Sequence, residues 1–101
     1  MPRIRFEHIA AHARTRLPAL MRKWLPSGLA RGREYLVLNP TRHDRRVGSF
    51  KINLATGRWA DFATGERGGD AIALYAYLER VSQKQAAIDV ARELGISPYT
   101  N

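Results

Sequence analysis

The chain has no cysteine, few histidines and no long apolar segment. Without cysteine it forms no disulfide and offers no thiolate to a zinc ion. His8 and His12 have the i, i+4 spacing of a helical metal site, but Glu7 is the one carboxylate near them, so two polar residues on a helix face are the better interpretation. No signal peptide and no run of about 18 apolar residues is present. We therefore expect a cytoplasmic protein with no metal, no cofactor and no membrane contact.

Acidic residues are also scarce, because 9 Asp and Glu face 17 Lys and Arg and give a net charge of +8. The excess is uneven: residues 1–32 carry a net +6, residues 33–67 a net +3 and residues 68–101 a net −1. This distribution predicts one side that faces a polyanion and one side that packs. A basic surface that is simply solvated is the alternative.

Length and patterning predict one small α+β domain. The 101 residues are 45% hydrophobic, which allows a modest core but no deep enzyme cleft. We expect a single domain over residues 1–101, with a basic helical segment at 1–30, an antiparallel β-sheet at 33–64 and a helical hairpin at 70–96. Pro18 should divide the first segment. Asp70 and Ser82 are candidate helix caps, and Gly95 is a candidate helix end.

The stretch "SFKINLATGRWADF" predicts a β-hairpin with two possible registers. A two-residue loop would pair Lys51 with Phe62, burying Trp59 and exposing Phe62. A three-residue loop, with Gly57 in the left-handed conformation, pairs Phe50 with Phe62. The second register places Phe50, Ile52, Ala60 and Phe62 on one face and Lys51, Asn53, Trp59 and Asp61 on the other. We predict this register because it separates apolar from polar residues better, and it leaves Trp59 exposed.

An exposed Trp59 among basic residues predicts a site for single-stranded nucleic acid, where bases stack on aromatic rings and cations meet phosphates. Lys51, Asn53 and Arg58 would surround the ring. The site would extend over further basic residues at Arg42, His43, Arg45, Arg46 and Arg67. The alternative places Trp59 in the core and the arginines in a solvated loop.

No catalytic constellation is recognised. The sequence shows no nucleophile beside a base and no carboxylate cluster for two metal ions, so we expect no enzyme activity from the chain alone. The Gly-rich "GERGG" precedes a helix and could take a phosphate, but it lacks the Lys-Ser/Thr of a nucleotide-binding loop. A tight turn is the alternative for this stretch.

The order of motifs resembles the N-terminal zinc-binding domain of bacterial and phage DNA primases. The similarity covers about residues 35–96 and is closest to primase-like domains of phage and mobile-element replication proteins. The motifs that carry it are "WLP", "NPTR-x-D", "GSFKIN", "W-x-DFATG", "GGDAIAL" and the final "LGI". The resemblance implies a zinc-ribbon-like sheet packed with helices.

The metal ligands of the zinc-bearing relatives are missing. A C-x2-H pair and a C-x2-C pair flank their hairpin, and the corresponding positions here are Asn39, Arg42, Asp61 and Thr64. The resemblance therefore implies a zinc fold without zinc, which needs a substitute for metal binding. We expect an ion pair between Arg42 and Asp61, helped by Asn39 and Thr64. The alternative is that the four are unrelated surface residues.

By resemblance, the chain would be a non-catalytic module of a DNA primase or primase-helicase that binds the single-stranded DNA template for primer initiation. Its partner would be a replication protein with primase, polymerase or helicase activity. The alternative is a protein-interaction module that docks on a replicative helicase or polymerase without binding DNA.

Overall fold

Four helices and five strands make up the fold in the computed structural model, which describes residues 2–100. The helices are α1 (Phe6–Arg14), α2 (Leu17–Trp24), α3 (Ala71–Glu79) and α4 (Gln83–Leu94). The strands are β1 (Leu29–Arg31), β2 (Glu34–Leu36), β3 (Phe50–Asn53), β4 (Trp59–Asp61) and β5 (Arg67–Gly68). The strands pair antiparallel in chain order. The predicted α+β class with a small antiparallel sheet is confirmed.

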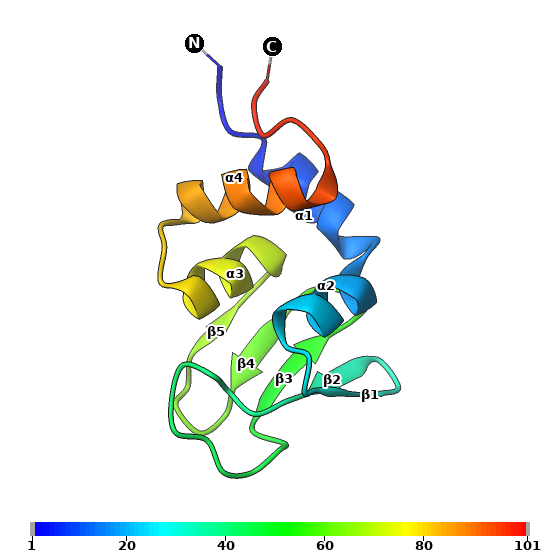
Figure 1. The fold of residues 1–101 in the computed structure, drawn as a ribbon, viewed down its shortest axis with the longest axis vertical. Coiled ribbons are helices and arrows are strands. Elements are labelled where there is room, and N and C mark those ends of the chain that lie inside the picture. Colours follow the sequence, from blue (N-terminus) through cyan, green and yellow to red (C-terminus); the bar gives the residue numbers. More distant parts are fainter. Residues whose placement is uncertain (1, 101) are drawn as a thin grey trace.

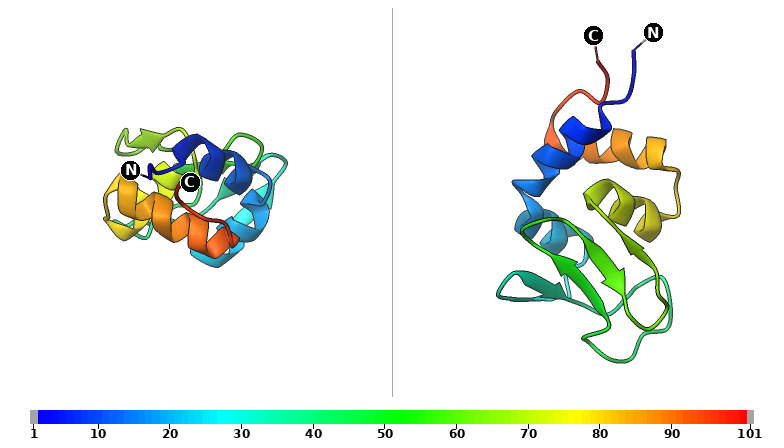
Figure 2. Two further views of the ribbon diagram at one scale, coloured as in Figure 1. Left: turned by 90° about the horizontal axis from the view of Figure 1, so that it is seen from above. Right: turned by 180° about the vertical axis from the view of Figure 1, so that it is seen from behind.

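The sheet lies at one end of an elongated molecule, and the helices stack on one of its faces (Figure 1 and Figure 2). Helices α2 and α3 lie next to the sheet, and α1 and α4 lie farther from it. The two ends of the chain meet beyond α1 and α4, where the Arg5 amide donates to the Pro98 carbonyl at 2.9 Å. Within residues 2–100 no helix covers the other face of the sheet, which is therefore open.

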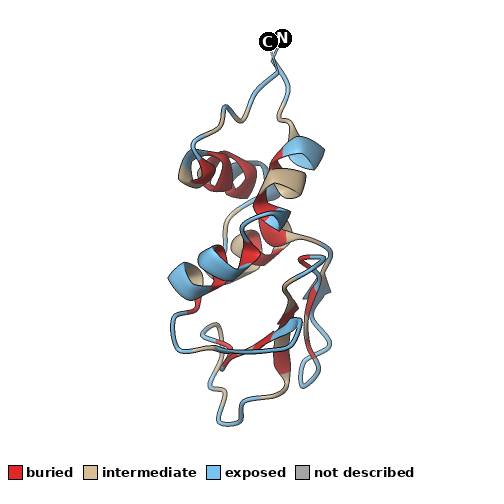
Figure 3. Ribbon diagram, turned by 90° about the vertical axis from the view of Figure 1, so that its right-hand side faces the viewer, coloured by how far each residue is buried: buried red, intermediate tan, exposed pale blue. Residues whose placement is uncertain are grey.

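The core lies between the sheet and the helices (Figure 3). Fully burying one large apolar side chain contributes about 1.5–3 kcal/mol, so a core of this size is the main source of stability. Its large buried side chains are Ile9, Leu17, Leu20, Met21, Leu25, Tyr35, Val37, Phe50, Ile52, Trp59, Ile72, Leu74, Val90 and Leu94.

Pro18 divides the N-terminal helical segment as predicted. Helix α1 ends at Arg14 and α2 begins at Leu17, which places Pro18 in the first turn of α2. A proline costs no hydrogen bond there, because the first amides of a helix have no partner within the helix. Within residues 2–100, the helices are all too short or too polar to cross a membrane.

The predicted caps of the last two helices are confirmed. The Asp70 side chain accepts a hydrogen bond from the Ala73 amide at 2.8 Å, and the Ser82 hydroxyl accepts one from the Gln85 amide at 3.0 Å. Gly95 ends α4 with φ of 74°, in the left-handed conformation that favours glycine. Local signals thus determine where α3 and α4 begin and where α4 ends.

The β3–β4 hairpin has a different register from the predicted one. Ile52 lies opposite Trp59, whereas the predicted three-residue loop pairs Asn53 with Trp59. The turn is longer by one residue because the Asn53 side-chain oxygen accepts hydrogen bonds from the amides of Ala55 and Thr56, at 2.8 and 3.0 Å. The predicted left-handed Gly57 is present, with φ of 83°, but inside this longer turn.

The shift of one residue exchanges the two faces of β4. Trp59 and Asp61, predicted to face solvent, are buried at 6% and 0% exposure. Phe62, predicted to be buried, is 71% exposed, and Ala60 also turns to the open face. The prediction of an exposed Trp59 is therefore wrong. Its ring instead stacks on Tyr77 of α3, with 4.8 Å between the ring centroids.

Burial of Trp59 requires a glycine on the neighbouring strand. Gly68 lies directly opposite Trp59 in β5, and a Cβ atom at this position would overlap the indole ring. The next residue, Gly69, meets no atom within 4 Å of where its Cβ would lie. The two adjacent glycines therefore differ in what they allow.

We predict that Gly68→Ala lowers the free energy of unfolding by about 1–3 kcal/mol, because an overpacked core must move the indole or the strand. Gly69→Ala is the matched control and should change stability by less than about 0.5 kcal/mol. Urea denaturation of both variants measures the difference. Equal stabilities would contradict this account of Trp59 packing.

Candidate nucleic-acid interface

We call the helix-free face of the sheet the outer face. Residues opposite each other on antiparallel strands share a face, and so do alternate residues of one strand. One row of outer-face residues therefore crosses all five strands and consists of Leu29, Leu36, Lys51, Ala60 and Arg67. A second row consists of Arg31, Glu34, Asn53 and Arg58. Phe62 follows Ala60 by two residues and lies on the same face.

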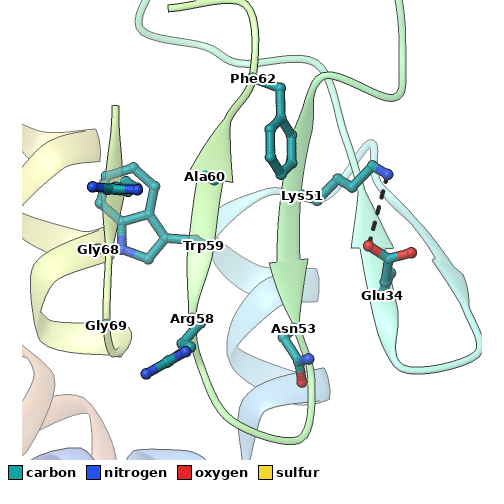
Figure 4. Close-up of a pocket in the computed structure, with 10 residues that line it drawn as sticks. Glu34, Lys51, Asn53, Arg58, Trp59, Ala60, Phe62, Gly68 and Gly69 are labelled. Atoms are coloured by element: carbon teal, nitrogen blue, oxygen red, sulfur yellow. Dashed lines mark ion pairs between the residues drawn. The ribbon is translucent and has the colours of Figure 1, made fainter. Parts of the chain in front are cut away.

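The middle of the outer face is hollowed (Figure 4). Ala60 lies between Lys51 and Arg67 in the first row, and its small side chain leaves space between their long ones. Gly68 of β5 and Gly69 after it add no side chain at this edge. The hollow is lined by Glu34, Lys51, Asn53, Arg58, Trp59, Ala60, Phe62, Arg67, Gly68 and Gly69.

Five of the predicted nucleic-acid-binding residues line this hollow: Lys51, Asn53, Arg58, Trp59 and Arg67. Trp59 contributes a buried wall and offers no free ring face. Asn53 uses its side-chain oxygen in the turn, so its amide nitrogen is the group that remains for a ligand. The exposed aromatic ring beside the hollow is that of Phe62, not that of Trp59.

Phe62, Lys51 and Glu34 form a contiguous group on the outer face (Figure 4). The Lys51 Nζ lies 5.7 Å from the centroid of the Phe62 ring, within the range of a cation–π interaction. The same nitrogen lies 3.8 Å from Oε2 of Glu34. Lys51 therefore sits between an aromatic ring and a carboxylate. Sequence reasoning missed Phe62 and Glu34, although the rejected two-residue loop exposes Phe62 beside a lysine.

The predicted extension into the basic loop at residues 41–48 lies outside the hollow. His43, Arg45 and Arg46 are exposed in this loop, which joins β2 to β3. The charges of the two arginines add to the positive field at this end of the molecule, but none of the three residues lines the hollow. Arg42, the fourth basic residue of the loop, turns toward a buried carboxylate and is taken up by an internal contact.

Arg42 and Asp61 form the expected ion pair. Arg42 donates from Nε to Oδ2 of Asp61 at 2.7 Å and from Nη2 to Oδ1 at 3.2 Å, which is a bidentate arrangement. The Asn39 side-chain amide donates to Oδ2 at 2.8 Å. The predicted help from Thr64 is wrong: its backbone amide donates to the Asp61 backbone carbonyl at 3.3 Å, and its hydroxyl accepts from the Glu66 amide instead of the ion pair.

Two further residues that sequence reasoning missed, Asp44 and Tyr77, belong to this cluster. The Tyr77 hydroxyl accepts the second amide hydrogen of Asn39 at 2.9 Å. The Asp44 carboxylate accepts from the Asn39 backbone amide at 2.8 Å and pairs with Arg42 at 3.3 Å. Tyr77 lies in an apolar helical run that gave no signal, whereas an acid inside the basic "TRHDRR" loop was a signal for Asp44. We call Asn39, Arg42, Asp44, Asp61 and Tyr77 together the polar clamp.

The clamp keeps Asp61 ionised although it is fully buried. The hydrogen bond from Arg42 is the largest cause that lowers the pKa of Asp61, from 3.8 to about 2; burial opposes it, and hydrogen bonds from Asn39 and the Ala63 amide assist it. A buried charge with fewer partners would be strongly destabilising. Within residues 2–100, no three His, Cys, Asp or Glu side chains gather as metal ligands.

Comparison of the chain with models of protein families gave no match, and comparison with curated proteins gave no match either. The features that indicate a function are therefore the geometry of the outer face, the polar clamp and the motif resemblance.

We predict that Arg42→Ala lowers the free energy of unfolding substantially, because it leaves the buried Asp61 carboxylate without a cation. Arg45→Ala removes the same charge from an exposed position in the same loop and should cost less than about 0.5 kcal/mol. Thermal and urea denaturation measure both. Similar melting of the two variants would show that the pair does not stabilise the fold.

The lowered pKa of Asp61 predicts an acid-dependent loss of stability. Because the folded value of about 2 lies below the unfolded value of 3.8, the stabilisation is complete above about pH 4 and is lost as the pH falls toward 2. It amounts to about 2 kcal/mol. The difference in unfolding free energy between the native chain and Asp61→Asn should narrow by this amount across that range. A constant difference would contradict the assignment.

Proposed function

We propose that the chain is a non-catalytic module that binds single-stranded nucleic acid on the outer face of its sheet. The observation that carries the proposal is the exposed Phe62 ring beside a hollow lined by Lys51, Arg58 and Arg67. Sites for single strands combine an aromatic platform with a basic track, because every base has a π-face and every nucleotide a phosphate.

The arrangement of these side chains fits an unpaired strand. Phe62 is 71% exposed, so a ring face is free for a base, and one such stack contributes about 1–3 kcal/mol. Lys51 and Arg67 lie on either side of Ala60, in strands β3 and β5, and Arg58 lies at the start of β4. A strand that crosses the sheet therefore meets cations along its path while one base occupies the ring.

We further propose that this module serves a DNA primase or primase-helicase and holds the template strand for primer initiation, while a separate catalytic domain or protein synthesises the primer. This part rests on the motif resemblance. The polar clamp supports it: Asn39, Arg42 and Asp61, three of the four positions that correspond to zinc ligands in the relatives, meet around one carboxylate. In this proposal, hydrogen bonds and an ion pair hold these segments together in place of the zinc ion of those proteins.

Docking on a replicative helicase or polymerase is the second candidate. Leu29, Leu38 and Val47 are exposed apolar side chains, 63%, 39% and 57% accessible, and Leu29 lies on the outer face itself. Exposed apolar groups near a basic surface also favour a protein partner. We prefer nucleic acid because the hollow is surrounded by cations.

Titration of a fluorescently labelled single-stranded oligonucleotide at several salt concentrations tests the proposal. Phe62→Ala should weaken binding about tenfold through the lost stack. Tyr99→Ala is the matched control, since Tyr99 is an exposed aromatic residue that pairs with Ile4 outside the sheet. Arg67→Ala should reduce the slope of log affinity against log salt by about 0.7. Arg92→Ala removes the same charge from α4 and should leave the slope unchanged.

Binding that is unaffected by Phe62→Ala and Arg67→Ala would contradict the proposed surface. No binding at low salt, together with a stable complex with a purified replicative helicase or polymerase, would establish the docking function in its place.

A further inference from the structure

Glu34 is an unexpected residue on a surface that attracts a polyanion. Among the described residues that line the hollow it is the one acid, and Lys51, Arg58 and Arg67 surround the same space. Its contact with Lys51 is long, at 3.8 Å, and both side chains are well exposed, at 52% and 36%. An exposed pair of this kind contributes roughly 0–1 kcal/mol, so folding gives little reason for a carboxylate at this position.

The position of Glu34 relative to Phe62 suggests a role in base recognition. Lys51 lies next to the Phe62 ring, and Glu34 lies on the far side of Lys51 (Figure 4). A base that stacks on Phe62 and extends over β3 brings its polar edge to these two charges. Because Lys51 is nearer to the ring, the exocyclic group, which projects farthest from the base, is the group that reaches Glu34.

We propose that Glu34 selects, among bases stacked on Phe62, those whose Watson–Crick edge presents an exocyclic amino group next to an unprotonated ring nitrogen, namely cytosine and adenine. Guanine also has an amino group, but the neighbouring N1 carries a hydrogen and cannot accept one from Lys51. An ionised carboxylate accepts hydrogen bonds and cannot donate. It therefore bonds the amino group of cytosine or adenine and repels the carbonyl oxygen that thymine and uracil place there. Lys51 donates to the adjacent ring nitrogen. The inference rests on the proposed function and narrows its ligand to strands rich in cytosine or adenine.

Twelve-residue oligonucleotides of deoxycytidine and deoxyuridine test this selection, because the two bases lack a methyl group and differ in the amino and carbonyl groups under study. The titrations are done at low salt and at pH 8, where cytosine is unprotonated. The native chain should bind oligo-deoxycytidine roughly tenfold more tightly. Glu34→Gln should bring the ratio near one, because its amide both donates and accepts.

Glu79→Gln is the matched control, since it removes the same charge from an exposed position on α3 outside the hollow. It should keep the tenfold ratio of the affinity for oligo-deoxycytidine to that for oligo-deoxyuridine. Loss of a negative charge raises the affinity for both oligonucleotides, and this general gain cancels in the ratio. A preference for cytosine that survives Glu34→Gln would overturn the inference.

The failure of this inference and the failure of the proposed function give different results. Equal binding of both oligonucleotides, weakened by Phe62→Ala, would overturn base selection by Glu34 and leave single-strand binding intact. Binding of neither oligonucleotide at low salt would overturn the proposed function, and base selection with it.

Discussion

The buried carboxylate of Asp61 is the constraint on which the rest of the structure depends. Its oxygens accept four hydrogen bonds, two from Arg42 and one each from Asn39 and the Ala63 amide. Position 61 must point inward to reach these donors. Since alternate residues of a strand share a face, Trp59 then also points inward, and Phe62 points outward. The polar clamp, the aromatic core and the outer face therefore follow from one register.

Local signals in the sequence were sufficient for the break before α2, for the limits of α3 and α4 and for half of the hairpin, but the predicted helical segment ran to residue 30 and so overlapped β1. Pro18, Asp70 and Gly95 act within one turn of the helix they limit, so their effects can be predicted without knowing the fold. The faces of β3 were also predicted correctly, with Ile52 inward and Lys51 outward. The faces of β4 were not, because separating apolar from polar residues assumes that an acid faces solvent. The partner of that acid lies 19 residues earlier in the chain.

Burial of Trp59 has a cost that the core offsets. Within residues 2–100 its indole nitrogen has no hydrogen-bond partner, which costs roughly 1–3 kcal/mol. The ring stacks on Tyr77 and meets Phe50 edge to face, and a residue of its size gains much from burial. Of the basic residues predicted for the candidate site, Lys51, Arg58 and Arg67 line the hollow, and the exposed aromatic residue beside it is Phe62 rather than Trp59. Lys51 of β3 keeps its face in either register, whereas the choice between Trp59 and Phe62 depends on the register.

On the proposed function, three features of the outer face contribute differently to nucleic-acid binding: its cations, the Phe62 ring and the Glu34 carboxylate. Lys51, Arg58 and Arg67 attract any polyanion, and this attraction weakens with salt. The Phe62 ring can stack on a base that is unstacked from its neighbours, which favours a single strand over a duplex whose bases already stack on each other. In the proposed binding mode, a carboxylate at Glu34 would lower the general attraction and so make binding depend more on the base that occupies the ring. On the proposed function, an acid that weakens overall affinity is therefore the residue that gives the surface its selectivity.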